Sequence, residues 1–282
     1  MTFVGCMDVW DALLLGVAQG FTEFFPVSSS GHLLLIQGLG GGEDLERYLL
    51  FDLVCHLGTL FALFLMLYRP LLDLIRGRDL PLLLQVVLGT LPLGLVPFFL
   101  GPIKRGYSTP ALLSVTFFIT AFLLFLASGV SRRTSRRTSS EEIEGGKIPE
   151  ENLWRDPLYI GLMQTVAILP GISRSGATIT AALSLGWSRE RAFVFSFLLA
   201  VPAILAGTTF EFLEGWWCGD GGCVALGWDL YCVGFLASLF CGYLALKLLM
   251  RLMVRNSLSY FGWYCVLLGA VALYLYGLPL SV

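Results

Sequence analysis

Ionisable and hydroxyl side chains gather between Gln19 and His32, inside an otherwise apolar region of the chain. This stretch carries one carboxylate, three consecutive hydroxyl groups and one imidazole, from Glu23, Ser28, Ser29, Ser30 and His32. Polar groups at membrane depth cost free energy, so they are functional candidates by default. If Ser29 lies in the first turn of a helix, His32 can reach its hydroxyl, which outlines a nucleophile and its base. Direct attack of His32 on phosphorus is the alternative.

Gln19 and Glu23 are four residues apart, so they share one face of a predicted helix. Together with phosphate oxygens they could hold a divalent cation, Mg²⁺ or alternatively Ca²⁺, because both cations prefer oxygen ligands. Glu23 could instead orient the imidazole of His32. The residue types fit either role.

A second polar stretch, Pro170 to Thr178, repeats part of the first. One constant shift of the sequence aligns Gln19 with Gln164, Ser28 with Ser173, Ser30 with Ser175, and Gly31 with Gly176. Arg174 falls opposite Ser29, and its planar guanidinium suits phosphate oxygens. Arg174 neutralising Glu23 is the alternative.

Each polar stretch is expected to end one half-helix and to begin another. The first N–H groups of a helix and its positive dipole end attract anions, so two such ends that converge predict one anion site. The residues expected to bind the anion are Gln19, Ser28, Ser30, Gly31, Ser173, Ser175, Gly176 and Thr178. For the glutamine and the serines, hydrogen bonds to neighbouring helices are an equally good explanation.

The composition is that of a polytopic membrane protein. Of 282 residues, 56% are hydrophobic and 13% are charged, and the mean hydropathy is +0.79. No nucleic-acid surface, phosphate-binding Walker loop or dinucleotide fingerprint is present in the sequence. The chain is therefore expected to be a single all-α membrane domain over residues 1–282.

Six segments are long and apolar enough to cross a bilayer, and two more are broken by proline, glycine and serine. The predicted spans are 48–68, 81–100, 110–130, 189–213, 228–250 and 260–280. The broken segments, 9–39 and 157–186, are predicted to be re-entrant helical hairpins. Each half then holds one hairpin and three spans, which makes residues 1–130 and 157–282 two repeats of inverted topology.

The distribution of positive charge supports this topology. If each hairpin returns to its own side, most of the 18 Lys and Arg residues lie on one side of the membrane. The positive-inside rule makes that side cytoplasmic. The 131–156 loop is then cytoplasmic and both termini face outward.

Asp52 and His56 lie one helical turn apart on the first predicted span. We expect them to make a structural hydrogen bond between helices. A supporting role beside the anion site is the alternative.

The stretches from Gln19 to His32 and from Leu169 to Gly176 resemble those of bacterial undecaprenyl-diphosphate phosphatases of the bacitracin-resistance type. The resemblance covers nearly the whole chain in length, span order and both motifs. It implies an inner-membrane enzyme that removes the terminal phosphate of a C55 isoprenyl diphosphate and recycles the carrier for peptidoglycan synthesis. Its active site would open toward the periplasm.

The resemblance also implies roles for single residues. The catalytic set would be Glu23, Ser29, His32 and Arg174, and a divalent cation would lie at Glu23 and Gln19. Many members have glutamate where this chain has Gln19, whose carbonyl offers a cation less charge. The expected partners are an isoprenyl diphosphate lipid, the bilayer and, as one option, a second copy of the chain in a homodimer.

Two other functions fit the same residues. Inverted repeats occur in many transporters, so a lipid-phosphate flippase is the first alternative. A membrane protein that sequesters an antibiotic or a diphosphate without turnover is the second.

Overall fold

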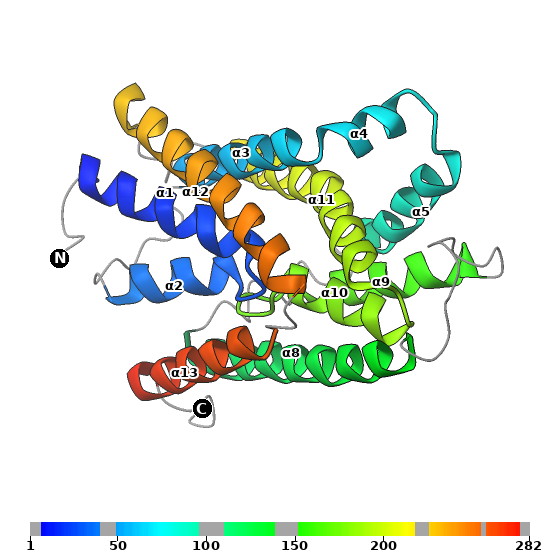
Figure 1. The fold of residues 1–282 in the computed structure, drawn as a ribbon. Helices are drawn as coiled ribbons and strands as arrows, with labels where there is room; N and C mark the ends of the chain where they lie inside the picture. The colour runs from blue at the N-terminus through cyan, green and yellow to red at the C-terminus, as the bar shows by residue number, and fades with distance from the viewer. Residues whose placement is uncertain are drawn as a thin grey trace.

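The computed structural model describes residues 7–39, 49–95, 110–138, 152–217, 226–254 and 258–276. Every regular element within these ranges is helical (Figure 1). The elements are α1 (Val9–Phe24), α2 (Ser29–Leu39), α3 (Leu49–Met66), α4 (Tyr68–Ile75), α5 (Leu80–Thr90), the 3₁₀ helix η2 (Leu91–Leu95), α8 (Pro110–Thr138), α9 (Arg155–Val166), α10 (Arg174–Ser184), α11 (Arg189–Trp217), α12 (Trp228–Val254) and α13 (Leu258–Tyr276).

Four of the described helices are long and apolar enough to cross a membrane. These segments are Leu112–Ser131, Arg189–Phe210, Trp228–Leu252 and Leu258–Tyr276. A fifth crossing results if α3 and α4 form one span, although they meet at an angle of 85°. Large side chains also face outward, with Phe240 62%, Trp263 66% and Tyr274 89% exposed. The predicted class, an all-α membrane protein, is confirmed.

The span predicted at 81–100 is shorter in its described part. α5 and η2 together cover Leu80–Leu95, and residues 96–100 lie outside the described ranges. Pro92 lies in η2, and a proline lacks the N–H that an α-helix needs at that point.

The span predicted at 110–130 agrees with the apolar segment Leu112–Ser131, and α8 itself continues past that segment to Thr138. The first part of the predicted 131–156 loop is therefore helical, and α9 begins at Arg155. Residues 139–151 lie outside the described part of the chain.

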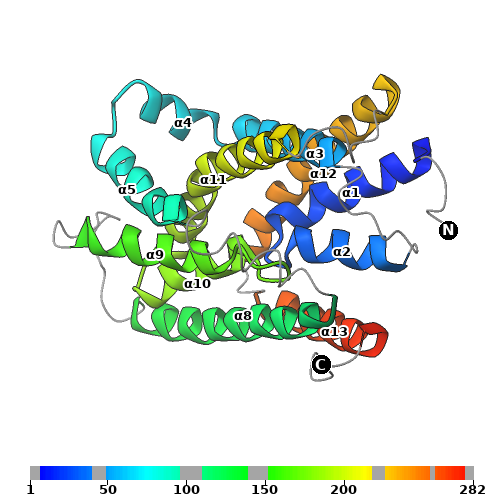
Figure 2. The ribbon, with the colours of Figure 1, turned by 180° about the vertical axis from the view of Figure 1, so that it is seen from behind.

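Each broken segment consists of two helices joined by a non-helical turn. A reciprocal capping box at Asp8 and Asp11 begins α1, and the chain leaves the helix after Phe24, just before Pro26. In the second segment α9 ends at Val166, before Pro170, and α10 begins at Arg174. In Figure 1, α1 and α2 approach from one side of the molecule and α9 and α10 from the other. The two turns meet near the centre, and Figure 2 shows the same arrangement from behind.

Two helix crossings that the sequence repeat relates depend on glycine. A Cβ atom on Gly16 would lie 2.8 Å from the carbonyl oxygen of Gly234, and one on Gly161 would collide with that of Gly89. The shift that aligns the polar stretches also aligns Gly16 with Gly161 and Gly89 with Gly234. The first hairpin therefore packs on α12, and the second packs in the same way on α5. Each hairpin is held by a helix from the other half of the chain.

Candidate functional site

A cavity of about 310 Å³ lies where the turns of the two helical pairs meet. Its walls come from α1, α2, α3, η2, α9, α10 and α11. Its polar lining residues are Thr22, Glu23, Ser28, Ser29, Ser30, His56, Gln164, Ser173, Arg174 and Thr208. The structure thus brings together polar groups that are up to about 190 positions apart in the chain and encloses them with apolar helices, as in small-molecule binding sites.

Glu23 is the centre of this polar cluster. Its carboxylate accepts hydrogen bonds from Nε2 of Gln19 at 3.0 Å and from Oγ of Ser29 at 2.7 Å. Nη2 of Arg174 lies 2.6 Å from the other carboxylate oxygen, and Nε2 of His56 lies 3.7 Å from Oε2. The Glu23 side chain is only 6% exposed, so its charge is stabilised by these neighbours rather than by bulk water.

Arg174 joins the two hairpin turns through this ion pair. Its Nη1 also donates to the backbone carbonyl of Ala200 at 3.2 Å. A guanidinium has five N–H donors in a planar fork, so these two contacts leave it able to bind further oxygens. The Arg174 side chain is 20% exposed and lines the cavity, which gives an anion access to it.

The two Ser-x-Ser-Gly segments make matching side-chain hydrogen bonds, although the backbone differs at the first serine, with a φ of 69° at Ser28 and −77° at Ser173. Oγ of Ser28 accepts from the N–H of Gly31 at 3.3 Å, and Oγ of Ser173 accepts from the N–H of Gly176 at 3.1 Å. In each segment the two serine hydroxyls are also in contact, at 3.3 Å and 3.2 Å. Both serines therefore cap the helices that begin at the cavity.

A hydrogen bond at the tips ties one hairpin to the other. Oγ of Ser28 accepts from the N–H of Gly171 at 3.1 Å, and Ser28 itself has a positive φ of 69°. Gly171 has a φ of 89°, and a Cβ atom there would collide with the hydroxyl of Thr116. Thr120 completes the junction by donating to the carbonyl of Gly171 at 2.8 Å. The turn accordingly requires glycine at this position.

The predicted pairing of Ser29 with His32 is wrong. Nδ1 of His32 lies 2.7 Å from the backbone carbonyl of Ser28, and Nε2 lies 2.9 Å from the hydroxyl of Tyr264. The imidazole stacks on Tyr264 and meets the ring of Phe117 edge-on. Because a carbonyl only accepts, Nδ1 carries the proton and donates it. Helical spacing alone could not reveal that α13 supplies this partner.

Several residues predicted to bind the anion do not line the cavity. Gln19, Gly31, Ser175, Gly176 and Thr178 lie behind its wall, whereas Ser28, Ser30 and Ser173 line it. The hydroxyl of Thr178 instead contacts that of Ser196 at 2.6 Å, and that of Ser175 lies 3.5 Å from the carbonyl of Phe25. These side chains hold α10 against its neighbours.

Two cavity residues lie outside the set assigned to the anion site from the sequence, although a supporting role beside that site was the alternative given for His56. His56 reaches Glu23 from α3, while its Nδ1 contacts the backbone carbonyl of Asp52 in the same helix at 2.8 Å. Gln164 lines the cavity and is 1% exposed, and neither of its amide atoms has a hydrogen-bond partner among the described residues. The alignment of Gln164 with Gln19 was the signal that could have identified it.

The predicted cation pair does not fit the observed orientation of Gln19. Its Nε2 faces Glu23, and its buried Oε1 has no hydrogen-bond partner in the described part of the chain. An amide nitrogen donates and cannot bind a cation. Both oxygens of Glu23 are in contact with donors, and the described residues contain no group of three or more His, Cys, Asp or Glu side chains able to hold a metal.

Comparison with known proteins covers both hairpins and the helices between them. The family described as bacitracin resistance protein BacA matches residues 12–271. An undecaprenyl-diphosphatase of Protochlamydia amoebophila is 42% identical over 270 residues, covering 95% of this chain and 99% of the relative. One of Carboxydothermus hydrogenoformans is 37% identical over 273 residues, covering 95% and 98%. One of Methanosphaera stadtmanae is 32% identical over 292 residues, also covering 95% and 98%.

Proposed function

We propose that this chain, which belongs to the bacitracin resistance protein BacA family, hydrolyses undecaprenyl diphosphate to undecaprenyl monophosphate and inorganic phosphate. The observation that carries this function is the pair of Arg174 and Glu23, 2.6 Å apart in a cavity that two helix N-termini line. Phosphoryl transfer is mainly a matter of positioning and charge neutralisation, and this cavity offers both. Release of the monophosphate would recycle the lipid carrier for cell-wall synthesis.

The diphosphate would bind by exchanging with a carboxylate. Phosphate oxygens take the place of Glu23 Oε1 on the fork of Arg174, and the cationic side chain keeps an anionic partner throughout. The amide of Gln164, which has no hydrogen-bond partner among the described residues, supplies a further N–H donor from the same hairpin as Arg174. The substrate would thereby give this buried amide a partner.

The geometry favours Ser29 over His32 as the nucleophile, with Glu23 as the general base. Ser29 Oγ already donates to Glu23 Oε2 at 2.7 Å, within the range for proton transfer. Ser29 Oγ bonds to the terminal phosphorus and its proton passes to Glu23. The bond from that phosphorus to the bridging oxygen breaks, and the lipid monophosphate leaves with the electron pair. Water then cleaves the phosphoserine and releases inorganic phosphate.

Direct attack by water is the alternative, with Glu23 as the same base. Trapping by acid quench separates the two routes, since only a serine nucleophile leaves radiolabelled phosphate on the protein. In either route His32 acts as a positioning residue, because its contacts hold the backbone of Ser28 at the start of α2. His32→Phe should then lower the turnover number more than it raises the Michaelis constant.

The membrane arrangement we propose keeps six crossing segments and two re-entrant hairpins in inverted repeats. The matched glycine crossings at Gly16 and Gly161 support it, since each hairpin repeats the packing of the other. The site would open toward the periplasm of a bacterial inner membrane, and both termini would face outward. Labelling of single cysteines introduced near α4 and near Ser30 in intact cells tests this orientation. Labelling of the first alone would contradict it.

A phosphate-release assay on the purified protein in detergent tests the function. Wild-type protein should release phosphate from undecaprenyl diphosphate. In Arg174→Ala the rate of phosphate release should fall at least about a hundredfold, as expected when a charged partner of the substrate is removed. The matched control is Arg78→Ala, because Arg78 pairs with Asp73 at an exposed site and does not line the cavity. Equal activity in the two variants would refute the site. No comparison favours the flippase alternative. Release of phosphate in this assay would also exclude a protein that only sequesters the diphosphate.

A further inference from the structure

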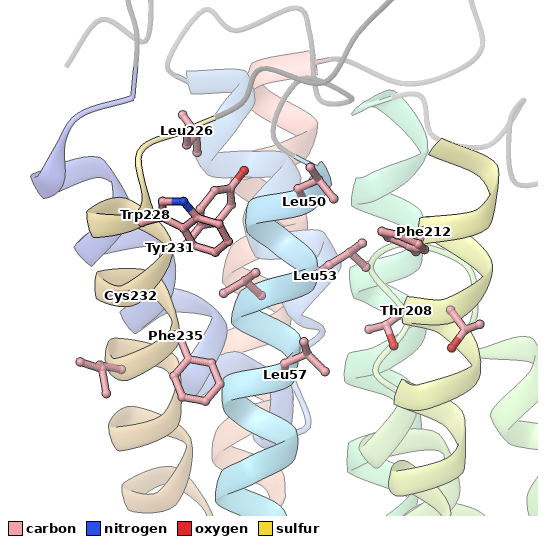
Figure 3. Close-up of a pocket in the computed structure, with 13 residues that line it drawn as sticks. Leu50, Leu53, Leu57, Thr208, Phe212, Leu226, Trp228, Tyr231, Cys232 and Phe235 are labelled. Carbon is pink, nitrogen blue, oxygen red and sulfur yellow. The ribbon is translucent and has the colours of Figure 1, made fainter. Parts of the chain in front are cut away.

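A second cavity, about 930 Å³ in volume, lies among α3, α11 and α12 (Figure 3). Its lining is mostly leucine and aromatic. The residues are Leu50, Leu53, Val54, Leu57, Thr208, Thr209, Phe212, Leu226, Trp228, Tyr231, Cys232, Phe235 and Leu236. In Figure 3 the side chains of Leu226, Trp228 and Tyr231 lie at one end and those of Leu57 and Phe235 at the other. We call this cavity the apolar groove.

The apolar groove adjoins the polar cavity at two points. Thr208 of α11 lines both of them. On α3, His56 lines the polar cavity and its neighbour in the chain, Leu57, lines the groove. An amphipathic molecule can therefore have its charged end beside Glu23 and Arg174 and its apolar part between α3, α11 and α12.

We infer that the apolar groove holds the isoprenyl tail of the substrate, an inference that rests on the proposed function. The groove meets the polar cavity near its inner end, where the tail leaves the diphosphate. Its other end carries Trp228 and Tyr231, aromatic residues of the kind that lie at membrane interfaces. An ordinary phospholipid chain, anchored by a head group at that interface, has no charged group to place beside Arg174. Continuity with the polar cavity therefore favours the isoprenyl diphosphate.

The apolar groove would select by shape rather than by hydrophobicity. Lipid tails are as apolar as leucine, so moving an isoprenyl tail from the bilayer into the groove gains little from removal of water. The gain comes from contacts between the tail and the groove wall, each of which is small. A bulky side chain in the groove should consequently reduce the use of long tails without disturbing the chemistry at Glu23.

Leu57→Trp tests the inference on a chain-length series of isoprenyl diphosphates with C5, C15 and C55 tails. Leu57 is 43% exposed, so tryptophan is tolerated sterically while filling the groove. The matched control is Leu65→Trp on the same helix, where the side chain is 51% exposed and lines neither cavity. We expect the loss of kcat/KM in Leu57→Trp to grow with tail length and to reach about tenfold for C55, or 1.4 kcal/mol.

Several outcomes would overturn the inference. An equal loss of kcat/KM for all three tail lengths in Leu57→Trp would indicate that bilayer lipid, and not the substrate tail, occupies the groove. The same dependence of kcat/KM on tail length in Leu57→Trp and Leu65→Trp would indicate this too. A change of oligomeric state in Leu57→Trp alone, seen by size-exclusion chromatography with light scattering, would assign the groove to a second copy of the chain. Leu236→Trp on α12, where the leucine is 61% exposed, repeats the test if Leu57→Trp fails to fold. Absence of phosphate release from every substrate by wild-type protein would refute the proposed function instead.

Discussion

Replacing Gln164 by leucine should make the protein more stable and the enzyme weaker. Gln164 is 1% exposed, and neither its Oε1 nor its Nε2 has a hydrogen-bond partner among the described residues. A buried polar group without a partner costs about 1–3 kcal/mol. In membrane proteins the measured contribution of a hydrogen bond between helices is smaller, about 0.6 kcal/mol on average. Because leucine has a similar size and no polar atom, Gln164→Leu should stabilise the substrate-free protein by about 1 kcal/mol.

The same substitution removes a donor that we propose for the diphosphate. A hydrogen bond to a charged group contributes about 1.5–3 kcal/mol, so kcat/KM should fall by about 10- to 150-fold. Phosphate release from undecaprenyl diphosphate measures this fall, and thermal unfolding in detergent measures the stability. Product inhibition by inorganic phosphate should weaken in parallel, since the phosphate ion uses the same donor.

Gln19→Leu is the matched control, because Gln19 occupies the aligned position in the other hairpin. Its Nε2 donates to Glu23 at 3.0 Å, so leucine there removes a bond made in the free protein. Gln19→Leu should therefore be less stable than wild type, the opposite sign from Gln164→Leu. A Gln164→Leu protein that is less stable and fully active would refute the reasoning and assign Gln164 a structural role.

Three further predictions concern packing and charge. Gly161→Ala should destabilise the protein markedly, because its Cβ would collide with the backbone oxygen of Gly89. Gly129→Ala, whose Cβ would meet nothing within 4 Å, is the control in the same thermal assay. Gln19→Glu should make phosphate release depend on Mg²⁺, since a second carboxylate replaces an amide donor beside Glu23. Equal rates of phosphate release by this variant with and without a chelator would contradict this prediction. Ser29→Ala should abolish acid-stable phosphoprotein, and labelling that persists in the variant would exclude Ser29 as the nucleophile.

The parts of the site that could be predicted from the sequence are those that short local motifs determine. Pro26 and Pro170 mark the breaks in the two hairpins, and the Ser-x-Ser-Gly repeat marks the starts of α2 and α10. Local propensity and capping determine these features, so a single sequence displays them. The contact of Arg174 with Glu23 needed one further step, the alignment of the two halves.

The parts that were missed depend on how helices rotate and which neighbours they meet. His32 was assigned to Ser29 by helical spacing, yet α13 supplies Tyr264 as its partner. His56 was placed on α3 correctly, but spacing along one helix does not indicate that its ring points toward Glu23 on α1. Such contacts arise from packing between distant segments, and periodicity within one segment carries no information on them.

The ion pair between Glu23 and Arg174 keeps both buried charges compensated in the substrate-free protein. Removing one partner of a buried pair leaves an uncompensated charge, so Arg174 needs an anion in the substrate-free state. Glu23 provides that anion from the opposite hairpin. In the exchange that we propose, phosphate would release Glu23 from Arg174, while Ser29 would keep its contact with the other carboxylate oxygen. Binding would thus convert a structural counter-ion into an available base, which couples arrival of the diphosphate to activation of the nucleophile.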